Sequence, residues 1–93
     1  GMYQIILAAS AKRKLKKLRR SGSFDENQYR EVASRLREGE PLPPVFQDHQ
    51  LQGDLSHLRE CHLAFDLLLT YRKNEVLKTL TITNIGTHDE IFG

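Results

Sequence analysis

Histidines are the residues of this chain whose chemistry stands out. Four are present, and an aspartate follows the third after a short interval: His49, His57, His62, His88 and Asp66. An imidazole titrates near neutral pH, so it can accept or donate a proton under physiological conditions. Metal-free RNA cleavage needs both events, because a base deprotonates the attacking 2′-hydroxyl and an acid protonates the leaving 5′-oxygen.

Zinc binding is the competing use of the same residues. Three imidazoles and one carboxylate form a reasonable ligand set, but here they are spread over 40 positions without any paired His-x-x-x-His spacing. We therefore favour the metal-free chemistry and expect no metal and no cofactor. Any one histidine alone is more often an ordinary surface or hydrogen-bonded side chain, and for His57 we keep that interpretation.

Convergence of the other histidines depends on the strands that carry them. His57 and His62 lie at the two ends of an expected strand and differ by five positions, so they should point to opposite faces. The next turn brings His62 close to Asp66, and a tail that returns along the last strand can bring His88 to the same end. The pattern therefore allows one cluster: His49, His62, Asp66 and His88.

The first half of the chain predicts a strand followed by a helical hairpin. Residues 3–7 are β-branched and aromatic, as in a strand. Ser10 is in place to cap a first helix, whose apolar side chains recur at spacings of three and four. Asp25 can cap a second helix, and Gly39 ends it. Two helices joined by a tight turn form a hairpin.

The second half predicts a small sheet. Three prolines make residues 40–53 an extended surface loop. Three candidate strands follow with short connections, near residues 57–63, 66–72 and 76–84, which predicts an antiparallel meander. The middle one has three consecutive leucines and should be central. The tail, residues 86–93, is too short for another element. The expected fold class is α+β, with an N-terminal strand and a helical hairpin packed on an antiparallel sheet.

Length and composition indicate one domain. With 93 residues, 39% hydrophobic and 28% charged, residues 1–93 suit a single small core whose stability a partner could increase. No apolar run approaches the length of a membrane span. Gly1 before Met2 looks like a scar of tag cleavage. The single Cys61 cannot form an internal disulfide, so a reducing cytoplasm is the expected location.

Charge is distributed very unevenly. The first 24 residues carry seven basic and no acidic side chains, whereas the remaining 69 carry seven basic and twelve acidic ones. Such a basic stripe attracts phosphate backbones, although a solvated helix face is the commoner explanation of a charge run. The candidate RNA-binding residues are Lys12, Arg13, Lys14, Lys16, Lys17, Arg19 and Arg20. Phe92 in the tail could stack on an unpaired base.

Five fragments, in order, resemble the RelE superfamily of bacterial toxins, in particular its YafQ-like branch. These are Leu-Pro-Pro-Val at 42–45, Asp-His-x-Leu-x-Gly at 48–53, Leu-Arg-Glu-Cys-His at 58–62, Asp-Leu-Leu-Leu-Thr-Tyr at 66–71, and Gly-Thr-His-x-x-x-Phe at 86–92. The resemblance implies a RelE-like fold and a ribosome-dependent endoribonuclease that cuts mRNA in the A site and is silenced by a cognate antitoxin.

The resemblance also implies a catalytic set. His88 would be the general acid, His49 or His62 the base or a phosphate ligand, and Asp66 the base or the residue that orients an imidazole. Two departures stand out, because Leu67 replaces a tryptophan common in the family and an arginine is missing near Asn84.

Loss of that arginine would have to be offset by another cation, and Arg59, Arg72 and Lys73 are the candidates. The alternatives left open are a ParE-like toxin that acts on DNA gyrase without nuclease activity and a catalytically decayed RNA-binding domain. The ParE-like toxin would not need the histidine set, and the missing arginine is what makes the decayed domain an alternative.

Overall fold

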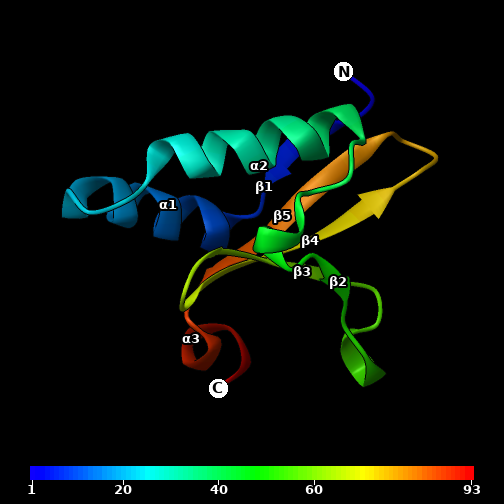
Figure 1. The fold of residues 1–93 in the computed structure, drawn as a ribbon. Coiled ribbons are helices and arrows are strands. Elements are labelled where there is room, and N and C mark those ends of the chain that lie inside the picture. The colour runs from blue at the N-terminus through cyan, green and yellow to red at the C-terminus, as the bar shows by residue number, and fades with distance from the viewer.

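The computed structural model describes residues 1–93 as an α+β fold, which confirms the expected class (Figure 1). Two short 3₁₀ helices, Pro44–Phe46 and Gly53–Leu55, interrupt the proline-rich connection. The strands and helices are β1 (Gln4–Leu7), α1 (Ala9–Ser21), α2 (Glu26–Glu38), β2 (His49–Gln50), β3 (Arg59–Ala64), β4 (Leu67–Asn74), β5 (Thr79–Gly86) and α3 (His88–Phe92).

One five-stranded sheet has the order β1-β5-β4-β3-β2. Strands β2 to β5 pair antiparallel, as the meander predicts, and β4 is the central strand. β1 pairs with β5 in parallel, with Gln4 opposite Thr79 and Leu7 opposite Ile82. The sheet is therefore mixed, because the helical hairpin supplies the crossover that a parallel pairing requires. β5 runs on for several residues beyond the last partner in β1.

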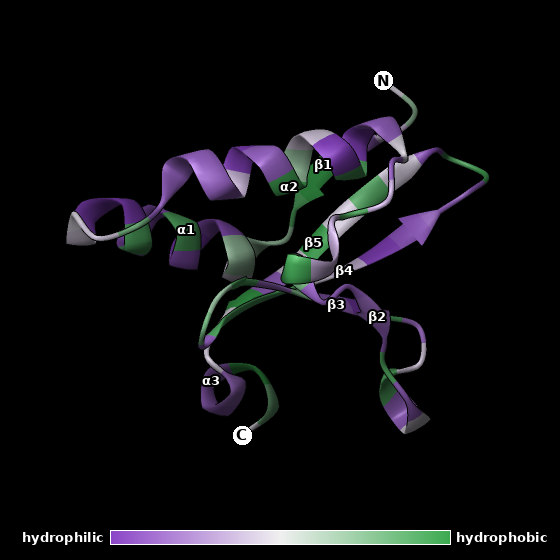
Figure 2. Cartoon of the chain, viewed as in Figure 1, coloured by the Kyte–Doolittle hydropathy of each residue, from purple (hydrophilic) through white to green (hydrophobic).

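The helical hairpin covers one face of the sheet, and α3 lies beyond the end of β5 (Figure 1). Figure 2 shows hydrophobic residues along β1 and β5 and hydrophilic ones on the outward sides of the helices. The core between these layers contains Leu15, Val32, Leu36, Cys61, Leu69, Tyr71, Leu80 and Ile82 among its buried residues. None of the helices has the length and apolar character that crossing a bilayer requires.

Local rules explain α2 well and α1 less well. The Asp25 side chain accepts from the Gln28 backbone N–H at 3.1 Å, and Gly39 ends α2 with φ 71°, a left-handed conformation that suits glycine. Ser10 does not cap α1, contrary to expectation, because α1 begins two residues earlier than expected and Ala8 occupies the cap position. The Ser10 hydroxyl instead donates to the Thr83 carbonyl at 2.9 Å, which ties α1 to β5.

Two further expectations about the second half were wrong. His57 lies in a turn before β3 and not at the end of that strand, since pairing with β4 begins only at Arg59. The tail is not irregular, because His88–Phe92 forms α3. Its cap is Thr87, whose side chain accepts from the Glu90 backbone N–H while the Glu90 side chain accepts from Thr87 N–H.

Cys61 is a free, fully buried thiol on β3. Burial raises its pKa to about 12, so it stays protonated at neutral pH. It is therefore a core residue without the thiolate character that nucleophilic or metal chemistry needs.

Candidate active site

His88 and Asp66 form the best-defined pair, at the end of the sheet where β3 turns into β4. Asp66 lies in the β3–β4 turn, and its Oδ1 accepts from both the backbone N–H and the ring Nδ1 of His88, each at 3.1 Å. These two hydrogen bonds, the backbone one first, lower the pKa of Asp66. With Nδ1 held by the carboxylate, Nε2 of His88 is left to meet a substrate.

Glu60 is a buried carboxylate between two histidines. Only 5% of its side chain is exposed, and its Oε1 lies 3.3 Å from Nε2 of His62 and 3.9 Å from Nε2 of His49. The sheet register explains this grouping, because His49 pairs with Glu60 across β2 and β3, and Glu60 pairs with Thr70 across β3 and β4. Glu60 thus links the imidazoles of two strands.

Sequence reasoning missed Glu60, although a signal was present. Glu60 and His62 are two positions apart on β3, and residues at that spacing point to the same face of a strand. A carboxylate that shares a face with a candidate catalytic histidine is itself a candidate.

His62 connects the His88–Asp66 pair with the group around Glu60. The ring centroids of His62 and His88 are 6.0 Å apart, and those of His88 and Phe92 are 6.1 Å apart. The structure therefore brings His62, Asp66 and His88 together directly, and His49 joins them through Glu60. His57 takes no part in these contacts, in agreement with its ordinary interpretation.

A cleft of about 780 Å³ opens beside these residues. His62, Asp66 and His88 line it together with Phe65, whose side chain is 98% exposed in the β3–β4 turn. Phe92, on α3, is 40% exposed. The cleft thus combines proton-transfer groups with exposed aromatic surface.

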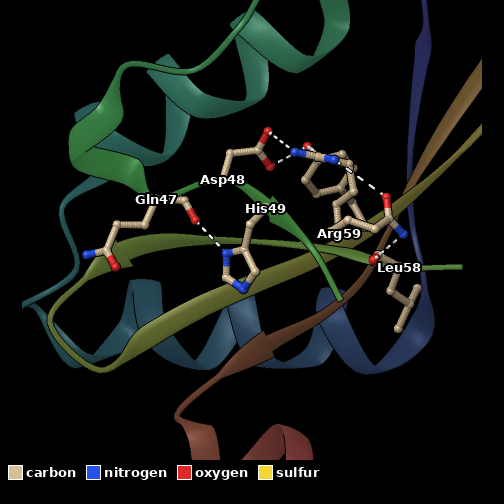
Figure 3. Close-up of polar contacts among 7 residues, drawn as sticks. Gln47, Asp48, His49, Leu58 and Arg59 are labelled. Carbon is tan, nitrogen blue, oxygen red and sulfur yellow. Dashed lines mark hydrogen bonds and ion pairs between the residues drawn. The ribbon is translucent and has the colours of Figure 1, made fainter. Parts of the chain in front are cut away.

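A second polar network fastens the segment that carries His49 (Figure 3). Asp48 accepts from Arg59 Nη2 at 2.9 Å and from the Tyr71 hydroxyl at 2.6 Å, and Arg59 Nε donates to the Tyr71 oxygen at 3.2 Å. The hydrogen bond to Asp48 raises the pKa of Arg59, and burial raises that of Tyr71. His49 Nδ1 donates to the Gln47 carbonyl at 2.8 Å, which fixes the ring with Nε2 toward Glu60.

The cations that could replace the missing arginine are placed differently from one another. Arg59 is engaged by Asp48, and Lys73 lies over the Tyr3 ring with Nζ 5.1 Å from its centroid. Arg72 is exposed on β4 opposite Thr81 and forms no ion pair. Of the three, Arg72 is the one that neither pairs with a carboxylate nor lies over an aromatic ring.

The basic stripe of α1 is not uniform either. Lys14 pairs with Glu90 at 2.6 Å and Arg19 pairs with Glu26 at 2.8 Å. The other five cations of the stripe form no ion pair within the chain: Lys12, Arg13, Lys16, Lys17 and Arg20. Arg13 and Lys17 line a small notch with Asn84, at the position where the expected arginine is missing.

Comparison with known proteins now decides the family. Residues 3–93 match the family described as bacterial toxin of type II toxin-antitoxin system, YafQ. The chain belongs to this family. A curated relative, the mRNA interferase toxin YafQ of Escherichia coli (strain K12), is 40% identical over 53 residues, which are 57% of this chain and 55% of the relative. That match spans about half of the relative's length.

Solved structures of bacterial toxins share the whole fold. A metal-bound toxin from Helicobacter pylori is 36% identical, with a TM-score of 0.89, over 98% of this chain and 100% of that chain. A chain of the E. coli DinJ–YafQ toxin–antitoxin complex is 28% identical, with a TM-score of 0.84, over 100% of both. The family interpretation and the fold drawn from the sequence motifs are thus confirmed.

A metal site does not fit the residues of this YafQ-family chain. No group of three or more histidine, cysteine, aspartate or glutamate side chains is arranged so that it could hold a metal ion. His88 Nδ1 is committed to Asp66 and His49 Nδ1 to the Gln47 carbonyl.

Proposed function

We propose that this chain is an mRNA interferase, an endoribonuclease that cuts mRNA in the A site of the ribosome by metal-free acid–base catalysis. The observation that carries the proposal is His88, held through Nδ1 by Asp66 with Nε2 free, beside the buried Glu60–His62 pair. The reaction needs two proton-transfer groups, and these are the imidazole of His88, held by Asp66, and the imidazole of His62, held by Glu60.

Each group has a distinct part in the proposed reaction. His62 accepts the proton of the 2′-hydroxyl as its oxygen attacks the adjacent phosphorus, and the Glu60 carboxylate stabilises the resulting imidazolium. The bond from phosphorus to the 5′-oxygen breaks, and His88 Nε2–H protonates that oxygen. The two imidazole rings lie edge to face with centroids 6.0 Å apart and both line the cleft, so both can reach one phosphate group bound there. Asp66 orients His88, and His49 assists Glu60 or contacts the phosphate.

Substrate binding draws on the unpaired cations and the exposed aromatic rings. The unpaired residues of the α1 stripe, with Arg72 on the sheet, provide positive charge for ribosomal RNA and mRNA phosphates. Phe92 and Phe65 offer exposed faces on which unpaired bases can stack. The proposed partners are therefore the ribosome and mRNA, and the place of action is the cytoplasm.

A cognate antitoxin is the other proposed partner. The structure of the E. coli DinJ–YafQ complex shows that a relative of this chain assembles with an antitoxin. The α1 stripe is suited to an antitoxin segment with acidic side chains, because complementary charge favours and orients such an encounter. Such binding would compete with RNA for the same surface.

The direct test is incubation of the purified protein with ribosomes programmed with a defined mRNA. We expect cleavage within the A-site codon, no cleavage of the same mRNA without ribosomes, and weaker ribosome binding as the salt concentration rises. Growth arrest in cells without any such cleavage, but with gyrase-linked DNA damage, would instead support the ParE-like function.

A further inference from the structure

We propose that Lys14 and Glu90 are positioning residues that hold α3, and with it His88, in the catalytic arrangement. The inference rests on the proposed function for the reaction that it serves. It separates Lys14 from the RNA-binding set to which the charge pattern of α1 assigned it.

α3 is too short to be stable without contacts to the rest of the fold. It has only five residues, and isolated helices of that length are unstable in water because too few hydrogen bonds offset the ordering of the backbone. None of its residues is buried. Its contact with Asp66 fixes the first residue, His88, and leaves the rest of the helix dependent on a second attachment.

Glu90 provides that second attachment. Its Oε1 accepts from the Thr87 backbone N–H at 2.9 Å, which closes the cap of α3, and its Oε2 accepts from Lys14 Nζ at 2.6 Å. One carboxylate therefore joins the N-terminal turn of α3 to α1. Lys14 and Glu90 are 76 positions apart in the chain, so this contact exists only in the folded arrangement.

The surroundings are shaped for this contact. A Cβ added at Gly86 would lie 2.9 Å from Glu90 Oε1 and 3.1 Å from Glu90 Cβ, so the absence of a side chain there lets Glu90 lie against β5. Lys14 is the least exposed charged partner of the stripe's two ion pairs, with 20% of its side chain exposed against 49% for Arg19. The hydrogen bond from Lys14 is also the main cause of the lowered pKa of Glu90.

A modest interaction is sufficient for a positioning role. Exposed ion pairs usually add little to global stability. The relevant equilibrium here is local, between docked and undocked α3, and such short terminal segments open with small free-energy differences. A small loss therefore changes the docked fraction, and the catalytic rate should follow the fraction in which His88 is in place.

The test uses Lys14→Met, Glu90→Gln and the double variant. Glutamine can keep the cap through its oxygen but turns its NH₂ group toward Lys14, so Glu90→Gln removes the attachment and preserves the start of α3. We expect each single variant to lower kcat on programmed ribosomes about threefold. The double variant should match the singles, because both changes remove one interaction.

A second readout needs no RNA. The Ile91 backbone N–H donates to the Thr87 carbonyl at 3.0 Å and exchanges with solvent only when α3 opens. Its hydrogen exchange, measured by NMR, should become about threefold faster in each variant. If the wild-type protein cuts no RNA, the proposed function fails, whereas this exchange measurement still decides whether Lys14 and Glu90 hold α3.

Two control variants complete the design. Lys78→Met removes an exposed ion pair with Glu75 in the distant β4–β5 turn. It should change neither kcat nor the Ile91 exchange rate. Lys12→Met removes an unpaired charge from the same helix and should raise KM with kcat retained. If Lys14→Met behaves like Lys12→Met, with kcat and Ile91 exchange at wild-type values, Lys14 is an RNA contact and the inference is wrong. Multiplicative effects in the double variant would also overturn it.

Discussion

Replacing His88 by alanine is expected to lower kcat for mRNA cleavage by about 10²–10⁴-fold, the usual contribution of a general acid. The imidazole is the proposed proton donor to the leaving 5′-oxygen, and its side chain is 57% exposed, so the fold loses little. The free energy of unfolding should change by less than about 1 kcal/mol. Single-turnover cleavage on programmed ribosomes, with urea unfolding beside it, measures both quantities.

His57→Ala is the matched control for that experiment. It makes the same chemical change in a turn outside the cluster, and we expect full activity. In cells, induced expression of the wild-type protein should arrest growth and His88→Ala should relieve the arrest. Toxicity that persists in His88→Ala would contradict the acid role and favour the gyrase-directed alternative.

Glu60→Gln is expected to have an effect of similar size, a loss of about 10²-fold or more in kcat. Glutamine has nearly the same shape, so the buried position should stay filled, but it carries no negative charge to stabilise a protonated His62. KM should change little because the side chain is 5% exposed and offers scant surface to RNA. Steady-state kinetics on the ribosome, with circular dichroism to check the fold, test this expectation.

The same substitution at an exposed glutamate provides the comparison. Glu31→Gln removes an i,i+4 ion pair with Arg35 on α2, away from the cleft, and should leave both kinetic constants unchanged. A Glu60→Gln variant with wild-type kcat would show that the base needs no partner carboxylate and would exclude Glu60 from the catalytic step.

Much of the fold could be predicted because local rules control it. Asp25 and Gly39 bound α2 by ordinary capping, and Phe24 packs on Tyr29 with ring centroids 5.9 Å apart. The parallel pairing of β1 with β5 could not be read in this way, because it joins residues more than 70 positions apart. α3 could have been found, since Thr87 and Glu90 have the spacing of a capping box.

The candidate site could likewise be predicted from the sequence only in part. His49, His62, Asp66 and His88 were identified from residue type and motif order, and the structure places them in one region. The contacts among these residues depend on the three-dimensional fold and could not be predicted from the sequence. The pairing of Lys14 with Glu90, for example, depends on how α1 lies against the end of β5, which no spacing rule encodes.

The central claim is that a 2′-hydroxyl of the mRNA itself attacks the scissile phosphate under acid–base catalysis by this cluster. The most direct measurement uses an mRNA with a single 2′-deoxy nucleotide immediately 5′ of the cleaved bond. We predict that cleavage at that bond disappears and that the unmodified mRNA yields a 2′,3′-cyclic phosphate end. Cleavage that continues at the deoxy position would show that another nucleophile attacks and would contradict the mechanism.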